Sequence, residues 1–486
     1  MKLLLSGHNY RYAAEQILLH TFPAEKPEFV TTLPGGGLRA RLTLSRGAKI
    51  TATAVIRRDG EAFTARAAVP DDAALAATAR DRLERGLLQR AFFRAAVKSG
   101  QTDIPWGAAA GIRPGTLVAK LLAAGMTERE AEAEFRRKYF VSATRAALAL
   151  DCAKAEVAAA GTLAPESVAL YIGIPFCPTR CAYCSFVSNS VEKSLKLLEP
   201  FLAALHREID ALAEAVRGTA AKICCVYVGG GTPTTLSAAQ LGALLAHVAD
   251  AFDLAHCREF TVEAGRPDTI TAEKLRVMRL RGVDRVSVNP QTFSDAVLAA
   301  IGRRHSTEDT LRAFALARDA GFRAVNADLI AGLPADDLSG FRRSLDRAVA
   351  LAPENITVHA LSRKKGSRVT VDEVPTPGGA EVLSMIDGSL TTLRSAGYAP
   401  YYLYRQKYSS GGLENTGWTK PGFECLYNII MMDETGSVLS LGGGGVTKLV
   451  ARGTRIERAF NPKYPQEYTE RIADIIRSKA RVREFL

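Results

Sequence analysis

The sequence predicts an α/β fold: a partial (β/α)6 barrel with an N-terminal α+β domain and a small C-terminal domain. Short β-branched runs alternate with amphipathic helical stretches between about residues 166 and 397, which is the pattern of a parallel sheet with right-handed crossovers. Six such units are fewer than the eight of a closed barrel, which favours an open one. The flanking segments lack this alternation. We therefore expect three domains, at 1–165, 166–397 and 398–486.

The first domain is expected to combine helices with paired strands. Apolar residues at helical spacing predict a helix over 10–19, and two alternating stretches predict strands over 38–44 and 50–56. A long Ala-, Arg- and Leu-rich stretch predicts a helix that begins near Asp72, as its N-cap, and ends near Gly100. The rest of this domain is helical in composition.

The six candidate strands of the barrel share β-branched residues, and a helical stretch follows most of them. They are 168–174, 223–228, 259–263, 285–288, 324–330 and 356–361. Parallel strands present their carboxyl ends at one edge of the sheet, so residues just after each strand should lie together. We expect the functional residues at that edge.

The C-terminal domain begins with an aromatic segment that holds Tyr401, Tyr402 and Tyr404, contains the glycine run 442–445 and ends in a basic helix. These tyrosines, with Trp418, could flank a flat ligand, because aromatic faces suit one. Packing of the domain is the preferred interpretation of each single residue.

Length and composition indicate an ordinary globular protein of two or three domains. The chain has 486 residues, of which 47% are hydrophobic and 23% charged. No apolar run is long enough for a membrane span, and the first residues are too briefly apolar for a signal peptide. A cytoplasmic location is therefore expected. In a reducing cytosol the eight cysteines are not expected to form a disulfide framework.

The chain carries 63 Lys and Arg residues against 51 Asp and Glu residues, a net charge of +12. Such a balance favours an anionic partner, which could be nucleic acid, phosphate or a polycarboxylate. The charge alone does not choose among these partners.

Three cysteines follow the first predicted strand of the barrel. Cys177, Cys181 and Cys184 are separated by three and then two residues, and thiolates at such spacing can close around one soft metal centre. Structural zinc, the alternative, needs four ligands, and a fourth would have to come from afar, from Cys224 or Cys225. Three ligands on a four-iron cube leave one iron open. A [4Fe–4S] cluster is therefore the favoured interpretation.

The motif resembles the radical S-adenosylmethionine (SAM) superfamily in its spacing, in the aromatic Tyr183 and in the strand that leads into it. Further segments resemble the oxygen-independent coproporphyrinogen III oxidase family, in particular its HemZ-like coproporphyrinogen dehydrogenase branch. They are Tyr171 with Ile174-Pro175-Phe176-Cys177, Gly229-Gly230-Gly231-Thr232-Pro233-Thr234, Asn326 with Asp328-Leu329-Ile330 and Gly332-Leu333-Pro334, and the late aromatic segment Tyr401-Tyr402-Leu403-Tyr404. The resemblance covers nearly the whole chain.

The resemblance implies two cofactors, a [4Fe–4S] cluster on Cys177, Cys181 and Cys184, and SAM bound through its open iron. It also implies residues that would contact SAM: Tyr171, Tyr183, Gly229, Gly230, Gly231, Thr232, Glu263, Gln291, Arg303 and Asp328. Glycines after a strand let the backbone approach a ligand. A tight turn, a solvated surface charge at Glu263 and a paired core carboxylate at Asp328 are the plainer alternatives.

Cations could serve a substrate that carries several carboxylates. Arg363-Lys364-Lys365 follows the sixth strand, and Arg405 and Lys407 follow the aromatic segment. A solvated loop is an equally good interpretation of both groups.

The sequence departs from the family's pattern at three places. Gly173 replaces a histidine before the first cysteine, Ser185-Phe186 stands where many relatives have another cysteine, and Glu263-Ala264-Gly265-Arg266-Pro267 replaces an acid-Asn-Pro pattern. These departures put a second SAM site, and with it the exact substrate, in doubt.

The sequence thus leads to a hypothesis about function. The protein would be an enzyme that decarboxylates two propionates of coproporphyrinogen III to vinyl groups by a 5′-deoxyadenosyl radical, a step of porphyrin and heme biosynthesis. Its partners would be a tetracarboxylate porphyrinogen and an unidentified electron donor. A heme-binding or heme-trafficking protein, an RNA-binding or RNA-modifying protein and a zinc module are the alternatives. No known nucleic-acid motif supports the RNA alternative, so nucleic acid is not an expected partner.

Overall fold

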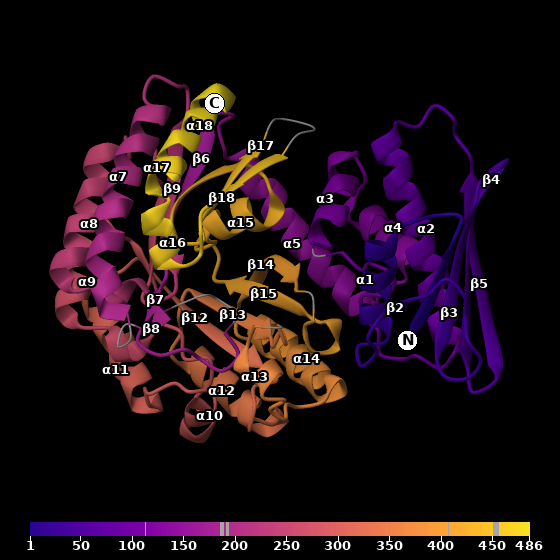
Figure 1. Cartoon of the computed structure of the whole chain (residues 1–486). Helices are drawn as coiled ribbons and strands as arrows, with labels where there is room; N and C mark the ends of the chain where they lie inside the picture. Colours follow the sequence, from indigo (N-terminus) through magenta and orange to yellow (C-terminus); the bar gives the residue numbers. More distant parts are fainter. Residues whose placement is uncertain (112, 185–188, 191–193, 365, 407, 451–455) are drawn as a thin grey trace. The chain divides into compact units, whose positions relative to one another are not determined.

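The computed structural model describes the chain except residues 112, 185–188, 191–193, 365, 407 and 451–455. The described residues fall into two units (Figure 1). One comprises Met1–Asp151, Gly378–Leu383 and Tyr404–Glu414, and the other comprises Cys152–Pro377, Ser384–Leu403 and Asn415–Leu486. The division of the sequence at 165 and 397 remains a proposal.

The first unit is built on a five-stranded sheet with the order β2-β1-β3-β4-β5. The strands β3 and β4 pair antiparallel, as the alternating stretches predict, and β5 extends the hairpin. One face of the sheet is buried because every second residue, such as Leu42 and Ile50, is apolar. The strands are β1 (Lys2–Ser6), β2 (Glu28–Phe29), β3 (Arg39–Ser45), β4 (Lys49–Arg58) and β5 (Glu61–Pro70).

Helices α1 and α2 supply the other half of this core. The helix predicted over 10–19 is α1. The prediction of Asp72 as an N-cap is wrong, because α2 begins at Ala77 after Ala76; the Asp72 carboxylate instead accepts a 2.9 Å hydrogen bond from the amide of Ala74, closing a local turn. The helices are α1 (Arg11–Thr21), α2 (Ala77–Lys98), α3 (Gly115–Ala123), α4 (Glu128–Tyr139) and α5 (Ala143–Gly161).

Arg405 belongs to the first unit and is buried there. Its guanidinium donates to the carbonyl of Gly412 at 2.7 Å and to that of Ala109 at 2.5 Å, and it lies 2.6 Å from Nδ1 of His20. Neither interpretation offered from the sequence, a cation for a substrate carboxylate or a residue of a solvated loop, fits Arg405, because the side chain is buried and bonded to protein groups. The N–H groups of its guanidinium instead bind Gly412 to Ala109 and His20 of the same unit. Lys407 lies outside the described residues.

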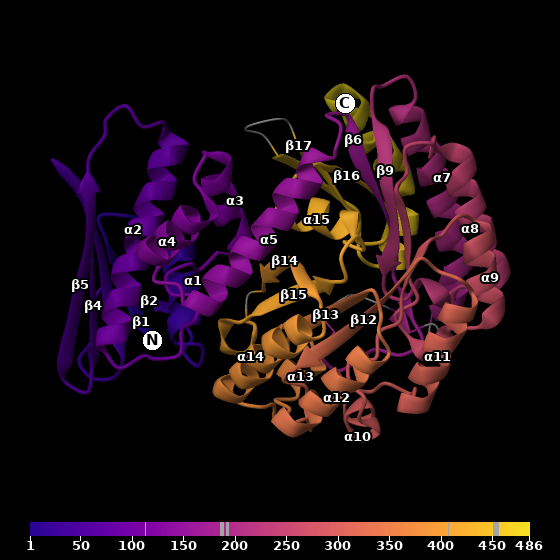
Figure 2. The ribbon, with the colours of Figure 1, turned by 180° about the vertical axis from the view of Figure 1, so that it is seen from behind.

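The second unit contains an eleven-stranded sheet, ordered β14-β15-β13-β12-β11-β10-β9-β6-β16-β17-β18. Its six central strands stand at the six predicted places and pair in parallel, forming the partial barrel (Figures 1 and 2). They are β6 (Ser167–Ile174), β9 (Lys222–Gly230), β10 (Glu259–Glu263), β11 (Arg285–Ser287), β12 (Ala324–Ala331) and β13 (Asn355–Ala360).

Strands from the C-terminal region extend this sheet at both sides. The strand β16 pairs in parallel with β6, and the antiparallel strands β15 and β17 follow at the two sides. These strands are β14 (Ala399–Arg405), β15 (Glu414–Thr419), β16 (Ser437–Gly442), β17 (Val446–Val450) and β18 (Ile456–Phe460). A separate two-stranded sheet pairs β7 (Phe176–Cys177) with β8 (Asn189–Ser190).

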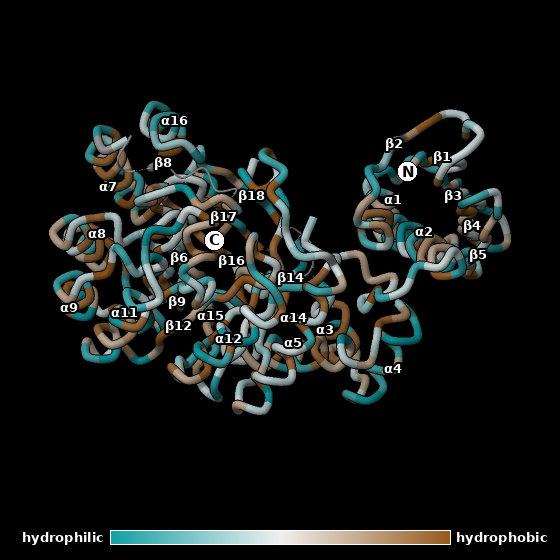
Figure 3. The backbone as a smooth tube through the Cα atoms, turned by 90° about the horizontal axis from the view of Figure 1, so that it is seen from below, coloured by the Kyte–Doolittle hydropathy of each residue, from teal (hydrophilic) through white to brown (hydrophobic). Residues whose placement is uncertain are grey.

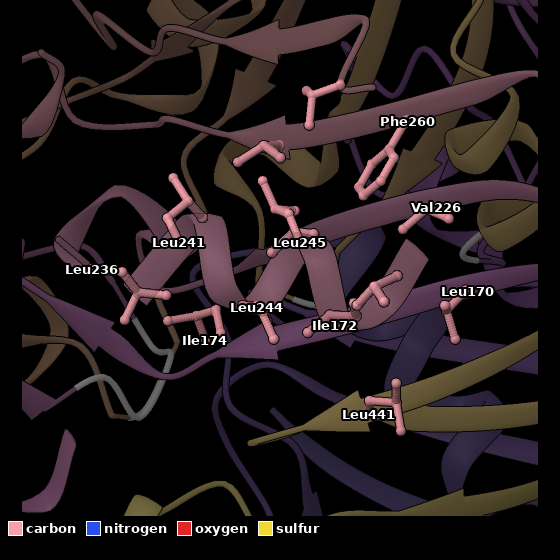
Figure 4. Packing of buried hydrophobic residues seen from close by; sticks show 14 of the residues in the cluster. Leu170, Ile172, Ile174, Val226, Leu236, Leu241, Leu244, Leu245, Phe260 and Leu441 are labelled. Carbon is pink, nitrogen blue, oxygen red and sulfur yellow. The ribbon is translucent and has the colours of Figure 1, made fainter. Parts of the chain in front are cut away.

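Amphipathic helices cover the outer face of the barrel sheet. Figure 3 shows hydrophilic and hydrophobic residues mixed along α8, α9 and α11, and Figure 4 shows Leu244 of α8 beside Ile172 and Ile174 of β6 in the buried cluster. The outer helices are α7 (Leu198–Val216), α8 (Ala238–Ala251), α9 (Ala272–Leu280), α11 (Thr307–Asp319) and α12 (Leu338–Ala350). Among the described residues, no helix has the length and apolar character that crossing a membrane requires.

The remaining helices and helical turns are mostly short. They are α10 (Asp295–Ala300), α13 (Arg368–Val371), α14 (Gly379–Ser395), α15 (Leu426–Asp433), α16 (Pro465–Glu470), α17 (Ile472–Ser478), α18 (Ala480–Phe485), η1 (Leu195–Leu197), η2 (Pro233–Thr235), η3 (Pro267–Thr269) and η4 (Ser410–Gly412).

Three aromatic side chains of the C-terminal region lie in the core. Tyr401, Tyr402 and Trp418 are at most 4% exposed, so they are part of the packing, as preferred from the sequence. Tyr404 is only partly buried and accepts a 3.2 Å hydrogen bond from Gln406.

A buried ion pair joins α15 to the amino-terminal ends of the barrel strands. Nε of Arg285 lies 3.4 Å from the carboxylate of Glu259, and both side chains are at most 5% exposed. The Glu259 carboxylate also accepts from the amide of Leu426 at 2.9 Å, one of the unpaired N–H groups at the start of α15. Arg285 donates to the carbonyl of Phe423 at 2.8 Å. These bonds anchor α15 to β10 and β11.

Replacing Arg285 with Met should therefore destabilise the second unit by about 3–5 kcal/mol, because it leaves the buried carboxylate of Glu259 without its cationic partner. Urea denaturation followed by circular dichroism measures the change. The matched control is Arg258→Met at an exposed site, which should stay within about 0.5 kcal/mol of wild type. A result for Arg285→Met as small as that of the control would contradict this account of the ion pair.

Candidate functional site

The cysteine loop leaves the sheet at the carboxyl end of β6. Cys181 is buried, whereas Cys177 and Cys184 are partly exposed. The loop is tied down by backbone contacts: the amide of Ala182 donates to the carbonyl of Ile301 at 2.9 Å, and Val369 donates to the carbonyl of Ala182 at 3.0 Å. The loop therefore has a fixed place at this edge of the barrel.

The glycine turn after β9 packs directly on the cysteine loop. The amide of Gly231 donates to Ile174 at 2.8 Å, and the hydroxyl of Thr232 donates to Sγ of Cys177 at 3.4 Å. A Cβ atom on Gly231 would lie 2.5 Å from the carbonyl oxygen of Phe176 and 3.0 Å from Sγ of Cys177. Only glycine fits at this position, so the sequence requirement is steric.

The three thiols do not form a ready site for a single ion. Within the described part of the chain, no three Cys, His, Asp or Glu side chains gather closely enough to hold one metal ion. The thiolates of a four-iron cluster each bond a different iron atom, so they stand farther apart than the ligands of one ion. Three thiols on one loop remain the donor set that such a cluster requires.

Arg303 contacts Tyr183, which lies within the cysteine loop. Arg303 is buried and donates to the hydroxyl of Tyr183 at 3.2 Å and to the carbonyl of Asn289 at 2.7 Å. Burial lowers the pKa of Arg303, but the neighbouring Tyr183 and Cys181 raise it more, so the pKa stays above its ordinary value. The guanidinium of Arg303 therefore stays positively charged next to the loop.

Glu263 lies at the carboxyl end of β10, facing the glycine turn. It accepts a 2.5 Å hydrogen bond from the hydroxyl of Tyr227, and a Cβ atom on Gly229 would lie 2.8 Å from its Oε2. Burial raises the pKa of Glu263 to about 7, and the charge of Asp328 adds to this effect. The carboxyl group can therefore exist in either protonation state near neutral pH.

Asp328 faces the same interior from β12. It accepts a 2.8 Å hydrogen bond from the amide group of Asn326 and lies 3.8 Å from Nε2 of His359. Burial would raise the pKa of Asp328, but the neighbouring His359, Asn326 and Thr357 favour the charged carboxylate more strongly and hold the pKa below its ordinary value. Asp328 is therefore an ionised carboxylate beside a carboxyl group of raised pKa.

Gln291 has a strained backbone and a side chain with an unused acceptor. Its φ is 68°, a left-handed conformation that non-glycine residues rarely adopt outside turns and functional sites. Its amide donates to the carbonyl of Asp328 at 2.8 Å, which fixes this geometry against β12. The side chain is 6% exposed, and its Oε1 atom is buried without a hydrogen-bond partner.

Tyr171 lies deeper in the barrel than the other predicted contacts. Its ring stacks on those of Tyr227 and Tyr427, with centroids 6.3 and 5.8 Å away. Burial raises its pKa, so the phenol stays neutral. Tyr427 comes from α15 and was not singled out from the sequence, because nothing in its neighbourhood signals that α15 lies inside the barrel.

Two cations near the cysteines complete the surroundings. Arg266 donates to Sγ of Cys181 at 3.6 Å. The sequence analysis noted Arg266 only within the segment that departs from the family's acid-Asn-Pro pattern and did not predict this contact. Lys364 is half-buried; burial lowers its pKa, and the nearby Cys184 opposes this effect. Lys365, Ser185 and Phe186 lie outside the described residues.

The site therefore gathers the predicted residues at one edge of the barrel, apart from the deeper Tyr171. Three thiols, a glycine turn without room for side chains, an unpartnered buried amide oxygen and two carboxyl groups face this region. These are the donors that a cluster with an open iron and a ligand with amine and hydroxyl groups would need.

Residues 171–348 match the family described as the Radical SAM superfamily. The chain is 40% identical over 372 residues to the oxygen-independent coproporphyrinogen-III oxidase-like protein HemZ of Bacillus subtilis (strain 168), spanning 75% of this chain and 74% of that protein. It is 27% identical over 303 residues to the heme chaperone HemW of Escherichia coli (strain K12), spanning 62% of this chain and 76% of that one.

Among solved structures, the coproporphyrinogen III oxidase HemN from Escherichia coli, a radical SAM enzyme, has a similar fold. The TM-score is 0.52, with 22% identity over 66% of this chain and 72% of that one. This likeness supports the α/β partial barrel.

The raised pKa of Glu263 predicts a specific dependence of stability on pH. Its folded pKa of about 7 exceeds the unfolded value of 4.5, so its contribution to stability is complete below the unfolded pKa and is lost as pH rises through the folded one. From about pH 5 to about pH 8, wild type should lose about 2 kcal/mol more than Glu263→Gln. Urea denaturation at both pH values measures this difference, and parallel pH profiles would contradict it.

Proposed function

Because the chain belongs to the radical SAM superfamily and, within it, to the family of HemZ-like oxygen-independent coproporphyrinogen III oxidases, we propose that it converts coproporphyrinogen III to protoporphyrinogen IX. The observation that carries this proposal is the 40% identity to HemZ across three quarters of both chains. The family also includes HemW heme chaperones. Family membership alone therefore does not distinguish an oxidase from a chaperone, and the conversion of coproporphyrinogen III has to be tested directly.

Two cofactors follow from membership of the superfamily, a [4Fe–4S] cluster and SAM. We propose that Cys177, Cys181 and Cys184 hold the cluster. When bound, the two cofactors would supply a 5′-deoxyadenosyl radical able to take a hydrogen atom from a propionate β-carbon; loss of CO₂ from the substrate, with one electron passing to a separate acceptor, would leave a vinyl group. The cysteine loop and the glycine turn are joined through Thr232 and Cys177. This contact would hold the thiols in position to bind the cluster.

SAM would be held by the polar side chains at the strand ends. The ionised Asp328 and the carboxyl group of Glu263 suit its hydroxyl and amine groups, and Gln291 offers an acceptor that no protein group uses. The backbone of Gly229–Gly231 can approach the ligand because it carries no side chains. Arg303 would act through Tyr183 and the loop, whose positions it fixes.

A heme chaperone is the second candidate function. The similarity to HemW of Escherichia coli supports it, since it covers 62% of this chain and most of that protein. A chaperone of this kind would bind heme and leave coproporphyrinogen unchanged. Heme titration followed by absorbance, beside the turnover assay below, separates the two functions.

Replacing Gln291 with Leu should weaken SAM binding roughly fivefold, because the substitution keeps the size of the side chain and removes one hydrogen bond worth about 1 kcal/mol. Equilibrium dialysis of the anaerobically reconstituted protein with labelled SAM measures the affinity. Gln466→Leu changes an exposed glutamine and should bind SAM as wild type does. Equal affinities of the two variants would argue against Gln291 as a SAM contact.

Turnover is tested on reconstituted protein with SAM, a reductant and coproporphyrinogen III, with 5′-deoxyadenosine and porphyrins measured by chromatography. We expect protoporphyrinogen and 5′-deoxyadenosine to form together in wild type and in Cys257→Ala, which changes a cysteine far from the loop in sequence. Both products should be absent in Cys181→Ala, which lacks one cluster ligand.

Either of two other results would revise the proposal. SAM cleavage without change of coproporphyrinogen would retain the radical SAM chemistry and favour the heme chaperone. Products formed equally by Cys181→Ala would contradict the assignment of the loop as the cluster site.

A further inference from the structure

Arg266 is a buried cation in direct contact with the cysteine loop. Its side chain is 3% exposed, and its Nη1 donates to Sγ of Cys181 at 3.6 Å. The same guanidinium donates to the carbonyl of Thr179 at 3.4 Å and to the hydroxyl of Thr179 at 3.0 Å. Arg266 therefore bonds with two residues of the loop, Thr179 and Cys181, which lie more than 80 positions away in the sequence.

The guanidinium is itself held in place from behind. Asp268 accepts from Nε at 3.1 Å and from Nη2 at 3.2 Å, a two-pronged contact that fixes the plane of the group. Nδ1 of His305 lies 3.7 Å from the same carboxylate. The orientation of Arg266 toward Cys181 is thus set by its neighbours and does not depend on the loop alone.

A hydrogen bond and a positive charge at a cluster thiolate have a known consequence. Reduction adds one negative charge to the cluster, and a nearby cation stabilises this more negative form. Hydrogen bonds to cluster sulfur atoms likewise raise the reduction potential. The low dielectric of a buried site strengthens both effects.

The geometry points to Arg266 as a positioning residue that orders the cysteine loop and raises the reduction potential of the [4Fe–4S] cluster through its N–H···S contact with Cys181. This inference depends on the cluster part of the proposed function and not on the identity of the substrate. It also gives a role to the Gly265-Arg266-Pro267 segment, which departs from the acid-Asn-Pro pattern of the resembled family.

The test compares reduction potentials of the full-length reconstituted protein, measured by redox titration with detection of the reduced cluster by electron paramagnetic resonance. In Arg266→Gln the equilibrium constant for reduction should fall roughly tenfold, a shift of about 59 mV to more negative potential for one electron. Arg266→Lys keeps the positive charge but loses the forked contacts of the guanidinium. Its reduction potential should therefore lie between that of Arg266→Gln and that of wild type. Iron and sulfide analysis confirms that each protein carries a full cluster.

The matched control is Arg276→Gln, which removes the same charge from an exposed position on α9 and should leave the potential unchanged. An equal shift in this control would overturn the inference, as would wild-type potentials in both Arg266 variants. If Arg266→Gln does not bind a cluster, the reduction potential of Arg266→Lys tests the inference. A potential of this variant below that of wild type supports the inference, and a potential equal to that of wild type overturns it.

The same experiment separates this inference from the proposed function. A wild-type protein that holds no cluster overturns both together. A wild-type cluster whose potential is insensitive to Arg266 overturns this inference alone and leaves the proposed function intact.

Discussion

The parallel pairing of β6 with β9 is the interaction on which the site depends. Its register places Ile174 opposite Gly230, so the two strands end together and their following loops must share one space. The hydrogen bond from Gly231 to Ile174 and the contact of Thr232 with Cys177 follow from this register. A shift by one residue would turn every side chain of a strand to the other face and would separate the thiols from the glycine turn.

The alternation of residues along the same strands divides the barrel into two chemical environments. Apolar residues such as Val262 and Val286 face the covering helices and supply the core. The residues between them, including Glu263, Ser287 and Asp328, face inward and bond with one another or with neighbouring polar groups. An interior of this kind can bind a polar ligand while the outer face provides the stability, which is the division of labour that a β/α barrel allows.

Local patterns predicted most of this architecture. The six parallel strands and the clustering of the cysteines, Glu263 and Gln291 at one edge follow from periodicity and from motifs placed at strand ends. Contacts between distant segments could not be predicted, because no local pattern records them. The strand β16 beside β6, Tyr427 inside the barrel and Arg266 on Cys181 are such contacts. The false N-cap at Asp72 arose because an aspartate in a turn resembles one at a helix start.

The central claim is that three thiols on one loop hold a [4Fe–4S] cluster with one iron left open for SAM. Electron paramagnetic resonance of the reduced, reconstituted protein, recorded with and without SAM, tests this claim most directly. The account predicts a cluster signal whose g values change when SAM is added, because the ligand binds the open iron. A spectrum without a cluster signal, or one that SAM leaves unchanged, would contradict it.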